Sequence, residues 1–149
     1  MNYITYKNVY SETHDHIITK AIICFEDKHM ETVALWDTGA AHSHISEDVI
    51  SAFNLKSCGE MSMSSHTGQS FSKEYVIDIE LPSMAMIKNI TVLSTANARY
   101  RGYDIGLIIG MDIIQLGDFR IDNTGETPVF TFRHSCDGNE DVLIETELF

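Results

Sequence analysis

Apolar residues in this chain fall in short runs rich in β-branched side chains, and Gly, Asn, Asp and Ser separate one run from the next. Very few windows keep a helical spacing for more than two turns. The pattern therefore predicts a mainly β fold. The expected strands are residues 17–25, 32–36, 61–65, 71–81, 87–93, 105–109, 119–121 and 129–132.

Two hairpins are expected among these strands. A polar turn at 26–29 joins the expected strands 17–25 and 32–36. The residues that follow Trp36 should therefore lie at one end of a sheet. The segment 66–69 looks like the tip of a longer hairpin, because Gly68 readily takes the positive φ that such a tip often needs.

Two short helices are also expected. Ser46 is a good N-cap for the first, which has acidic residues in its first turn. Its apolar stripe consists of Val49, Ile50, Phe53 and Leu55. The second helix is one or two turns at 111–116, between Gly110 and a closing Gly117.

Length and charge narrow the class of protein. A chain of 149 residues is about the size of one domain. It has 10 basic and 22 acidic residues, a net charge of −12 that repels nucleic acid and anionic membranes. Residues 1–133 are expected to form the domain. Residues 134–149 contain five acidic and no basic residues and are expected to be an acidic, solvated tail.

The cysteines and the N-terminus point to a cytoplasmic location. Cys24, Cys58 and Cys136 are an odd number at wide spacing, which is not a disulfide framework. Cys24 lies inside an apolar run and is expected to be a core thiol. The N-terminus has no apolar stretch of signal-peptide length, and no eighteen apolar residues run together.

Asp37 is the first candidate for chemistry, because an ionisable group here directly follows the apolar run 33–36. Asp-Thr-Gly alone is also common in turns. A wider sequence pattern supports a functional role for Asp37. The segment 43–46 and a short helix follow, and about seventy residues after Asp37 comes the apolar segment 106–114, which contains Gly110.

This combination resembles the retropepsin-like aspartic proteases, specifically their bacterial single-domain members, from about residue 32 to 132. The resemblance implies a single-lobe closed β structure with one or two short helices, active as a two-fold homodimer. It also implies that Asp37 is catalytic and that the Thr38 hydroxyl braces the loop against its counterpart. The active-site loop comprises Asp37, Thr38, Gly39 and Ala40, and the segment that packs behind it comprises Ile108, Ile109 and Gly110.

The same resemblance places a flap at the second hairpin. The flap and substrate-binding residues would be His66, Thr67, Gly68 and Gln69. An extended peptide would lie between this flap and the loop.

Acid–base logic supports a dimer independently of the resemblance. Peptide hydrolysis without a metal or a nucleophilic side chain needs one group to deprotonate water and another to protonate the carbonyl oxygen, and two carboxylates sharing one proton do both, as pepsin illustrates. The chain has one Asp-Thr-Gly. The segment 122–125 looks like a second copy, but its extra Asn123 breaks the spacing and favours an ordinary turn. The second carboxylate must then come from a second chain.

Several other residues have features of different functional sites. The pair His42 and His44 has metal-ligand spacing, yet alternate strand residues share a face without any metal. No cysteine is singled out as a nucleophile. Asp112 is expected to be structural, near the start of a short helix. Four methionines at strand spacing are expected to pack in a core: Met61, Met63, Met84 and Met86.

The sequence thus predicts a cytoplasmic aspartic endopeptidase that acts as a homodimer on peptides and needs no metal or organic cofactor. The alternative is a non-catalytic peptide-binding or scaffold module on the same dimeric fold.

Overall fold

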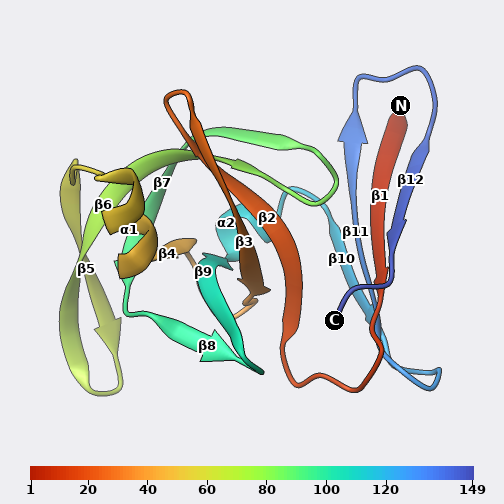
Figure 1. The fold of residues 1–149 in the computed structure, drawn as a ribbon, viewed down its shortest axis with the longest axis horizontal. Coiled ribbons are helices and arrows are strands. Elements are labelled where there is room, and N and C mark those ends of the chain that lie inside the picture. The colour runs from red at the N-terminus through yellow and green to blue at the C-terminus, as the bar shows by residue number, and fades with distance from the viewer.

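The computed structural model describes residues 1–149 and builds them into two β-sheets (Figure 1). The elements in chain order are β1 (Asn2–Val9), β2 (Ile17–Phe25), β3 (Lys28–Trp36), β4 (His44–Ser46), α1 (Glu47–Phe53), β5 (Gly59–Ser65), β6 (Gly68–Glu80), β7 (Met86–Thr95), β8 (Ala98–Tyr100), β9 (Tyr103–Ile109), α2 (Met111–Ile114), β10 (Asp118–Asp122), β11 (Val129–Cys136) and β12 (Val142–Thr146). The prediction of a mainly β fold with two short helices is confirmed. Neither helix is long and apolar enough to cross a membrane.

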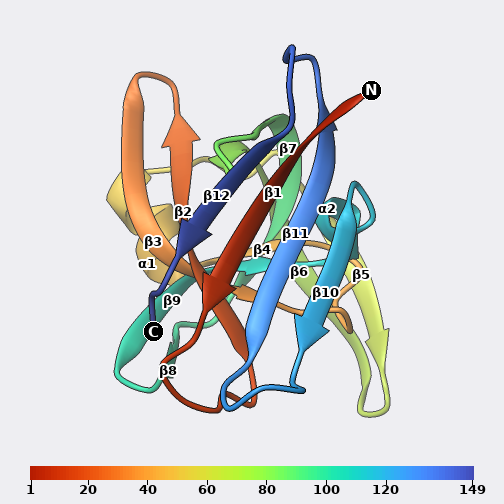
Figure 2. The same ribbon diagram turned by 90° about the vertical axis from the view of Figure 1, so that its right-hand side faces the viewer.

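The larger sheet carries the central part of the chain. Its strand order is β2-β3-β9-β4-β7-β6-β5, β8 pairs with β9, and an additional pairing between β2 and β6 curls the sheet back on itself. The smaller sheet has the order β10-β11-β1-β12 and lies against one side of it (Figures 1 and 2). The middle of the chain and its two ends therefore form separate layers.

The hairpin β2–β3 sets the position of everything that follows Trp36. β2 has the predicted bounds, but β3 begins at Lys28, four residues before the expected start, because the turn uses only Glu26 and Asp27. Glu26 takes a positive φ of 55°, which a two-residue hairpin turn requires. The tight turn pairs Ile17 with Trp36, so the residues before Ile17 lie beside those after Trp36.

The two ends of the chain add β1 and β12 to the smaller sheet, and the sequence predicted neither strand. β1 pairs antiparallel with β11 and parallel with β12. The boundary expected after residue 133 falls inside β11, and residues 142–146 of the expected tail form β12, whose side chains are exposed or half-buried. Asn8 holds the C-terminal segment in place. Its fully buried side-chain amide forms hydrogen bonds with the main chain of Leu148 and with the hydroxyl of Thr146.

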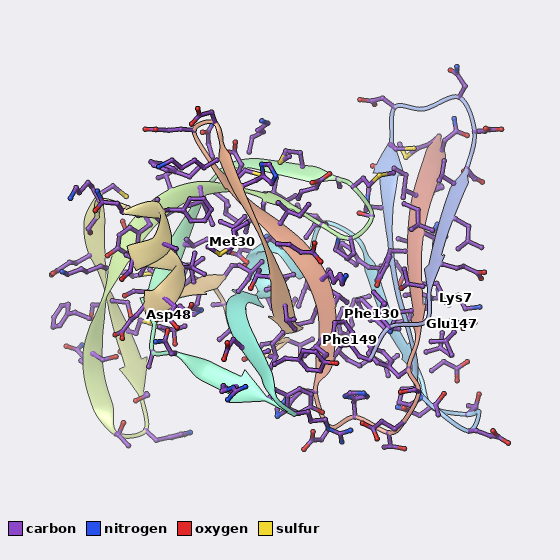
Figure 3. All side chains as sticks on the ribbon, in the orientation of Figure 1. Lys7, Met30, Asp48, Phe130, Glu147 and Phe149 are labelled. Atoms are coloured by element: carbon purple, nitrogen blue, oxygen red, sulfur yellow. The ribbon has the colours of Figure 1, made fainter.

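The part of the core next to Asp37 lies between the two sheets. The Trp36 ring packs against three phenylalanine rings at centroid distances of 5.0–6.1 Å, and its Nε1 donates to Thr19 Oγ1 at 2.9 Å. Those rings belong to Phe119, Phe130 and Phe132. Figure 3 places Phe130 between the sheets. Trp36 thus fixes the end of β3 immediately before Asp37.

Two predictions of burial were wrong. Met84 and Met86 are 68% and 40% exposed, because they flank the turn between β6 and β7, while Met61 and Met63 are half-buried on β5. Cys24 is half-buried instead of lying in the core, and burial raises the pKa of its thiol.

Candidate active site

Asp37 lies directly after β3, where the chain turns away from the sheet. Its backbone N–H donates to the carbonyl of Ile109 at 2.8 Å, which extends the parallel pairing of β3 with β9 by one bond. Its carboxylate Oδ1 accepts the backbone N–H of Gly39 at 2.8 Å. Asp37 is half-buried, whereas Thr38 and Gly39 are exposed. Hydrogen bonds thus fix the backbone at Asp37, while the side chains of Asp37 and Thr38 lie at the surface.

The segment 108–110 lies directly behind the loop. The backbone N–H of Met111 donates to the carbonyl of Ala40 at 2.7 Å, one residue beyond Gly110. A Cβ on Gly110 would lie 2.6 Å from the His42 carbonyl oxygen and 2.8 Å from that of Ala40. Only glycine allows this approach, so the structure brings together the two segments on which the sequence resemblance rests.

A buried hydroxyl and a carboxylate join the far end of the loop to α2. The Ser43 hydroxyl is fully buried, accepts the N–H of Gly110 at 3.0 Å and donates to Asp112 Oδ1 at 2.7 Å. Asp112 also accepts the backbone N–H groups of Ser43 and Ile113 at 2.8 and 2.9 Å. Asp112 therefore has the structural position predicted for it, near the start of the helix. Its bond to Ser43 was not predicted, since the two are 69 residues apart.

A hollow of about 310 Å³ opens beside Asp37 and Thr38. Residues from three separate parts of the chain line it: Asp15, His16 and Ile17 before and in β2, Leu35 and Trp36 in β3, and Phe119 and Ile121 in β10. Five of its nine lining residues are apolar, and Asp15, His16, Asp37 and Thr38 are the polar ones. Asp15, His16, Phe119 and Ile121 were not predicted as site residues from the sequence. The tight hairpin register is the signal that would have placed the first two beside Asp37.

The hairpin tip does not reach Asp37 within one chain. β5 and β6 project from the body (Figure 1), and Gly68 at the tip has the predicted positive φ, 120°. The turn consists of His66 and Thr67, while Gly68 and Gln69 already belong to β6, and all four residues are exposed. None of them lines the hollow beside Asp37.

A larger hollow, of about 900 Å³, lies elsewhere, between α1, β3, β8 and β9. It contains none of the predicted site residues. The segment 122–125 is a turn, as predicted, in which Asp122 Oδ1 accepts the N–H and the hydroxyl of Thr124 at 2.9 and 2.6 Å.

His44 is the one titratable side chain of the loop region with a clear shift. Burial lowers the pKa of its imidazole and outweighs a backbone hydrogen bond at His42 and the carboxylates of Asp112 and Asp37, which oppose the shift. Its Nδ1 is buried without a hydrogen-bond partner. The structure contains no group of three or more His, Cys, Asp or Glu side chains arranged to hold a metal ion.

The fold of this chain is similar to that of solved protein structures. No protein-family model and no curated protein sequence matches the chain. Among solved structures, a retropepsin-like aspartic protease from Rickettsia conorii has a TM-score of 0.59 and 13% identity, covering 89% of this chain and 94% of that one. The protease of simian foamy virus (mac) has a TM-score of 0.47 and 15% identity, covering 66% of this chain and 92% of that one. The chain has the retropepsin-like fold, which confirms the predicted fold class.

Proposed function

We propose that this protein is an aspartic endopeptidase in which Asp37 and the partner's Asp37 together activate a water molecule. The observation that carries the proposal is the anchoring of the Asp37 loop. The main chain of the loop forms hydrogen bonds with Ile109 and Met111, yet the Asp37 carboxylate and Thr38 line an open hollow. A rigid backbone with an accessible carboxylate is what a preorganised acid–base site needs.

The chemistry requires both chains. Two carboxylates close together hold one proton between them, because both cannot readily be ionised at that distance. The ionised carboxylate accepts a proton from water as the water oxygen attacks the peptide carbonyl carbon. The protonated carboxylate donates its proton to the carbonyl oxygen. Collapse of the tetrahedral intermediate breaks the C–N bond, and the leaving nitrogen takes a proton from the pair.

The substrate in this proposal is an extended peptide. It would lie between the Asp37 loop and the β5–β6 hairpin, with its backbone paired like an added strand and alternate side chains in pockets. The apolar lining from Ile17, Phe119 and Ile121 makes the hollow beside Asp37 suitable for an apolar side chain.

The test is Asp37→Asn, assayed against a peptide library across a range of pH. The amide can still accept the Gly39 N–H bond but cannot act as base or share a proton, so we expect activity to fall by about 10²- to 10⁴-fold with folding intact. Asp27→Asn, at the exposed tip of the β2–β3 hairpin, is the matched control. Activity of the wild type should also fall faster than concentration on dilution, because each site needs two chains.

Cleavage that persists in Asp37→Asn would overturn the proposal. So would a wild-type dimer that binds peptides but cleaves none, which is the result expected of a non-catalytic peptide-binding module.

A further inference from the structure

The segment 11–16 leads from β1 into β2 and is held against the turn between β8 and β9 (Figure 1). The Arg101 guanidinium in that turn pairs with Glu12 at 2.8 Å and donates to the carbonyl of Thr13 at 2.8 Å. The same guanidinium lies 5.5 Å from the centroid of the Tyr100 ring. These contacts fix the path of the chain where it reaches the candidate site.

Tyr100 holds the last part of this segment. Its hydroxyl donates to Asp15 Oδ1 at 2.8 Å and lies 3.1 Å from His14 Nδ1. The His16 ring packs edge-on against the Tyr100 ring at 5.1 Å. The hydrogen bond from Tyr100 lowers the pKa of the Asp15 carboxyl, so this group is ionised at neutral and mildly acidic pH. A residue of β8 therefore sets the position of Asp15 and stabilises its charge.

The Asp15 carboxylate is exposed and has no cationic partner within the chain. No ion pair of the structure includes it. The hollow of about 900 Å³ differs in this respect, because it contains two ion pairs of its own, Lys20 with Glu31 and Arg99 with Asp104, both at 3.0 Å. Asp15 is thus a positioned negative charge that remains available to a cationic group from outside the chain.

The hollow beside Asp37 combines this carboxylate with an apolar wall. Asp15 and Asp37 are its acidic residues, no Lys or Arg lines it, and His16 is its one basic residue. A lysine or arginine side chain buries its methylene stem against apolar surface and keeps its charged end beside water or a carboxylate. The hollow therefore matches a long cationic side chain better than an acidic or a wholly apolar one. The apolar wall consists of Ile17, Leu35, Trp36, Phe119 and Ile121.

We propose that Asp15 makes this hollow select a lysine or arginine side chain of the peptide substrate, and that Tyr100 positions Asp15 for this role. The inference rests on the proposed function and narrows its substrate class. In the bound peptide, the methylene stem contacts the apolar wall and the cationic end forms charge-assisted hydrogen bonds with Asp15. Asp15 takes no part in proton transfer, which stays with Asp37.

The net charge of −12 is a second reason for basic peptides to bind, but its effect differs from that of Asp15. The field of the whole chain acts on a positive charge anywhere in the peptide and is screened over roughly 8 Å at physiological salt. Asp15 acts only on the side chain that occupies the hollow. A preference confined to one peptide position at physiological salt is therefore the effect that belongs to Asp15.

The test starts from the library peptide that the wild type cleaves best, or binds best if none is cleaved. Each position of this peptide is replaced in turn by lysine, norleucine or glutamate, and kcat/KM is measured at physiological salt. Norleucine has the four-carbon stem of lysine without the charge. At one position we expect lysine to exceed norleucine roughly fivefold, the size of a good exposed ion pair, and to exceed glutamate by more.

Substitution of Asp15 assigns the preference to this carboxylate. Asp15→Asn should bring the ratio of lysine to norleucine at that position close to one, and Asp15→Lys should make glutamate the preferred residue. Asp27→Asn is the matched control, because it removes the same unit of charge at the far end of the β2–β3 hairpin. It should keep the wild-type ratio.

Substitution of Tyr100 tests the positioning. Tyr100→Phe removes the hydroxyl that holds Asp15, and we expect the ratio of lysine to norleucine to fall roughly twofold or more, since the peptide must then order a free carboxylate. Tyr103→Phe is the control, because Tyr103 is 41% exposed and its hydroxyl forms no hydrogen bond. A general loss of structure would lower both rates together and leave the ratio unchanged.

Binding provides a measurement that does not depend on catalysis. Asp37→Asn should hold the peptides without cleaving them. Fluorescence anisotropy with labelled lysine and norleucine peptides should give the same preference of roughly fivefold, and adding Asp15→Asn should remove it.

The inference and the proposed function can fail separately. Equal rates and affinities for the lysine and norleucine peptides, or the same loss of preference in Asp15→Asn and Asp27→Asn, would overturn the role of Asp15 and leave Asp37-dependent cleavage intact. An Asp15-dependent preference in binding, with no cleavage by the wild type, would support this inference and overturn the proposed function. Peptides that are neither bound nor cleaved would overturn both.

Discussion

Gly110 has no room for a side chain, because the carbonyl oxygens of His42 and Ala40 would lie 2.6 and 2.8 Å from a Cβ. We expect Gly110→Ala to lower the free energy of unfolding by about 1–3 kcal/mol, since the loop must move away from the added methyl group. Peptidase activity should fall as well, because the displaced loop carries Asp37. Urea denaturation and a peptide assay measure the two effects.

Gly125→Ala is the matched control for this substitution. Gly125 is exposed, and the nearest atom to its Cβ position is 4.0 Å away. We expect a change within about 0.5 kcal/mol. Equal effects of the two substitutions would show that the close approach at Gly110 does not hold the loop.

His44 links the stability of the site region to pH. Burial lowers the pKa of its imidazole from the ordinary value of 6.5, so the unfolded chain binds a proton here more readily than the folded chain. The free energy of unfolding should therefore decrease as pH falls through about 6.5 and stop decreasing below the folded value. His44→Gln should lose less stability than wild type between about pH 7 and 5, measured by urea denaturation at each pH.

The control for His44 is His29→Gln, in the exposed β2–β3 hairpin. It should keep the pH dependence of the wild type. A His44→Gln variant with the same dependence as wild type would contradict the assignment of this effect to the buried imidazole.

At the scale of elements, Ser43 and Asp112 connect the start of β4 to α2. The helix has only four residues, too few for stability of its own, so its position depends on tertiary bonds. Ser43→Ala removes the buried acceptor of the Gly110 N–H and the hydroxyl that donates to Asp112, and should destabilise the fold by about 1–3 kcal/mol.

A double-mutant cycle with Asp112→Asn isolates the bond between them. The two residues are in direct contact, so we expect a coupling energy of about 0.5–3 kcal/mol from urea denaturation of the four proteins. Ser51→Ala, on the exposed face of α1, should be additive with Asp112→Asn. Additivity of Ser43→Ala and Asp112→Asn would mean that the helix and the loop are held independently.

At the scale of the whole molecule, the last residues close the smaller sheet. A chain ending at Asp141 loses β12 and the three hydrogen bonds that Asn8 makes to Thr146 and Leu148 at 2.6–2.8 Å. At ~1 kcal/mol for each bond, we expect the free energy of unfolding to fall by about 3 kcal/mol or more. Thermal and urea denaturation test this.

Glu145→Gln with Glu147→Gln removes the acidic charges of this segment but keeps the strand. That double variant should be within about 1 kcal/mol of wild type, because both side chains are exposed. A truncated chain as stable as wild type would show that β12 contributes nothing to stability and would support the prediction of a solvated tail.

Much of the fold could be predicted from local pattern. Alternating and β-branched runs identified most strands, Ser46 caps α1 as expected, with its hydroxyl accepting from Val49 at 3.3 Å, and Gly68 has the expected positive φ. These features depend on residues close together in the chain, where spacing and backbone preference decide the outcome. β1 and β12 were missed because their burial depends on each other: neither has a clear pattern alone, and each becomes a strand by pairing with a segment more than 130 residues away.

The sequence by itself determined that Asp37 directly follows a core strand. It also determined that a glycine-containing segment about seventy residues later matches the segment that the resemblance places behind the Asp37 loop. Tertiary structure alone decided which residues share its surroundings. Asp15 and His16 come beside it through a two-residue hairpin turn, and Ile121 through the stacking of two sheets. Sequence patterns report which face of an element is buried, but the identity of a neighbour across a sheet or between layers follows from register and topology, and those are set by the packing of the whole chain.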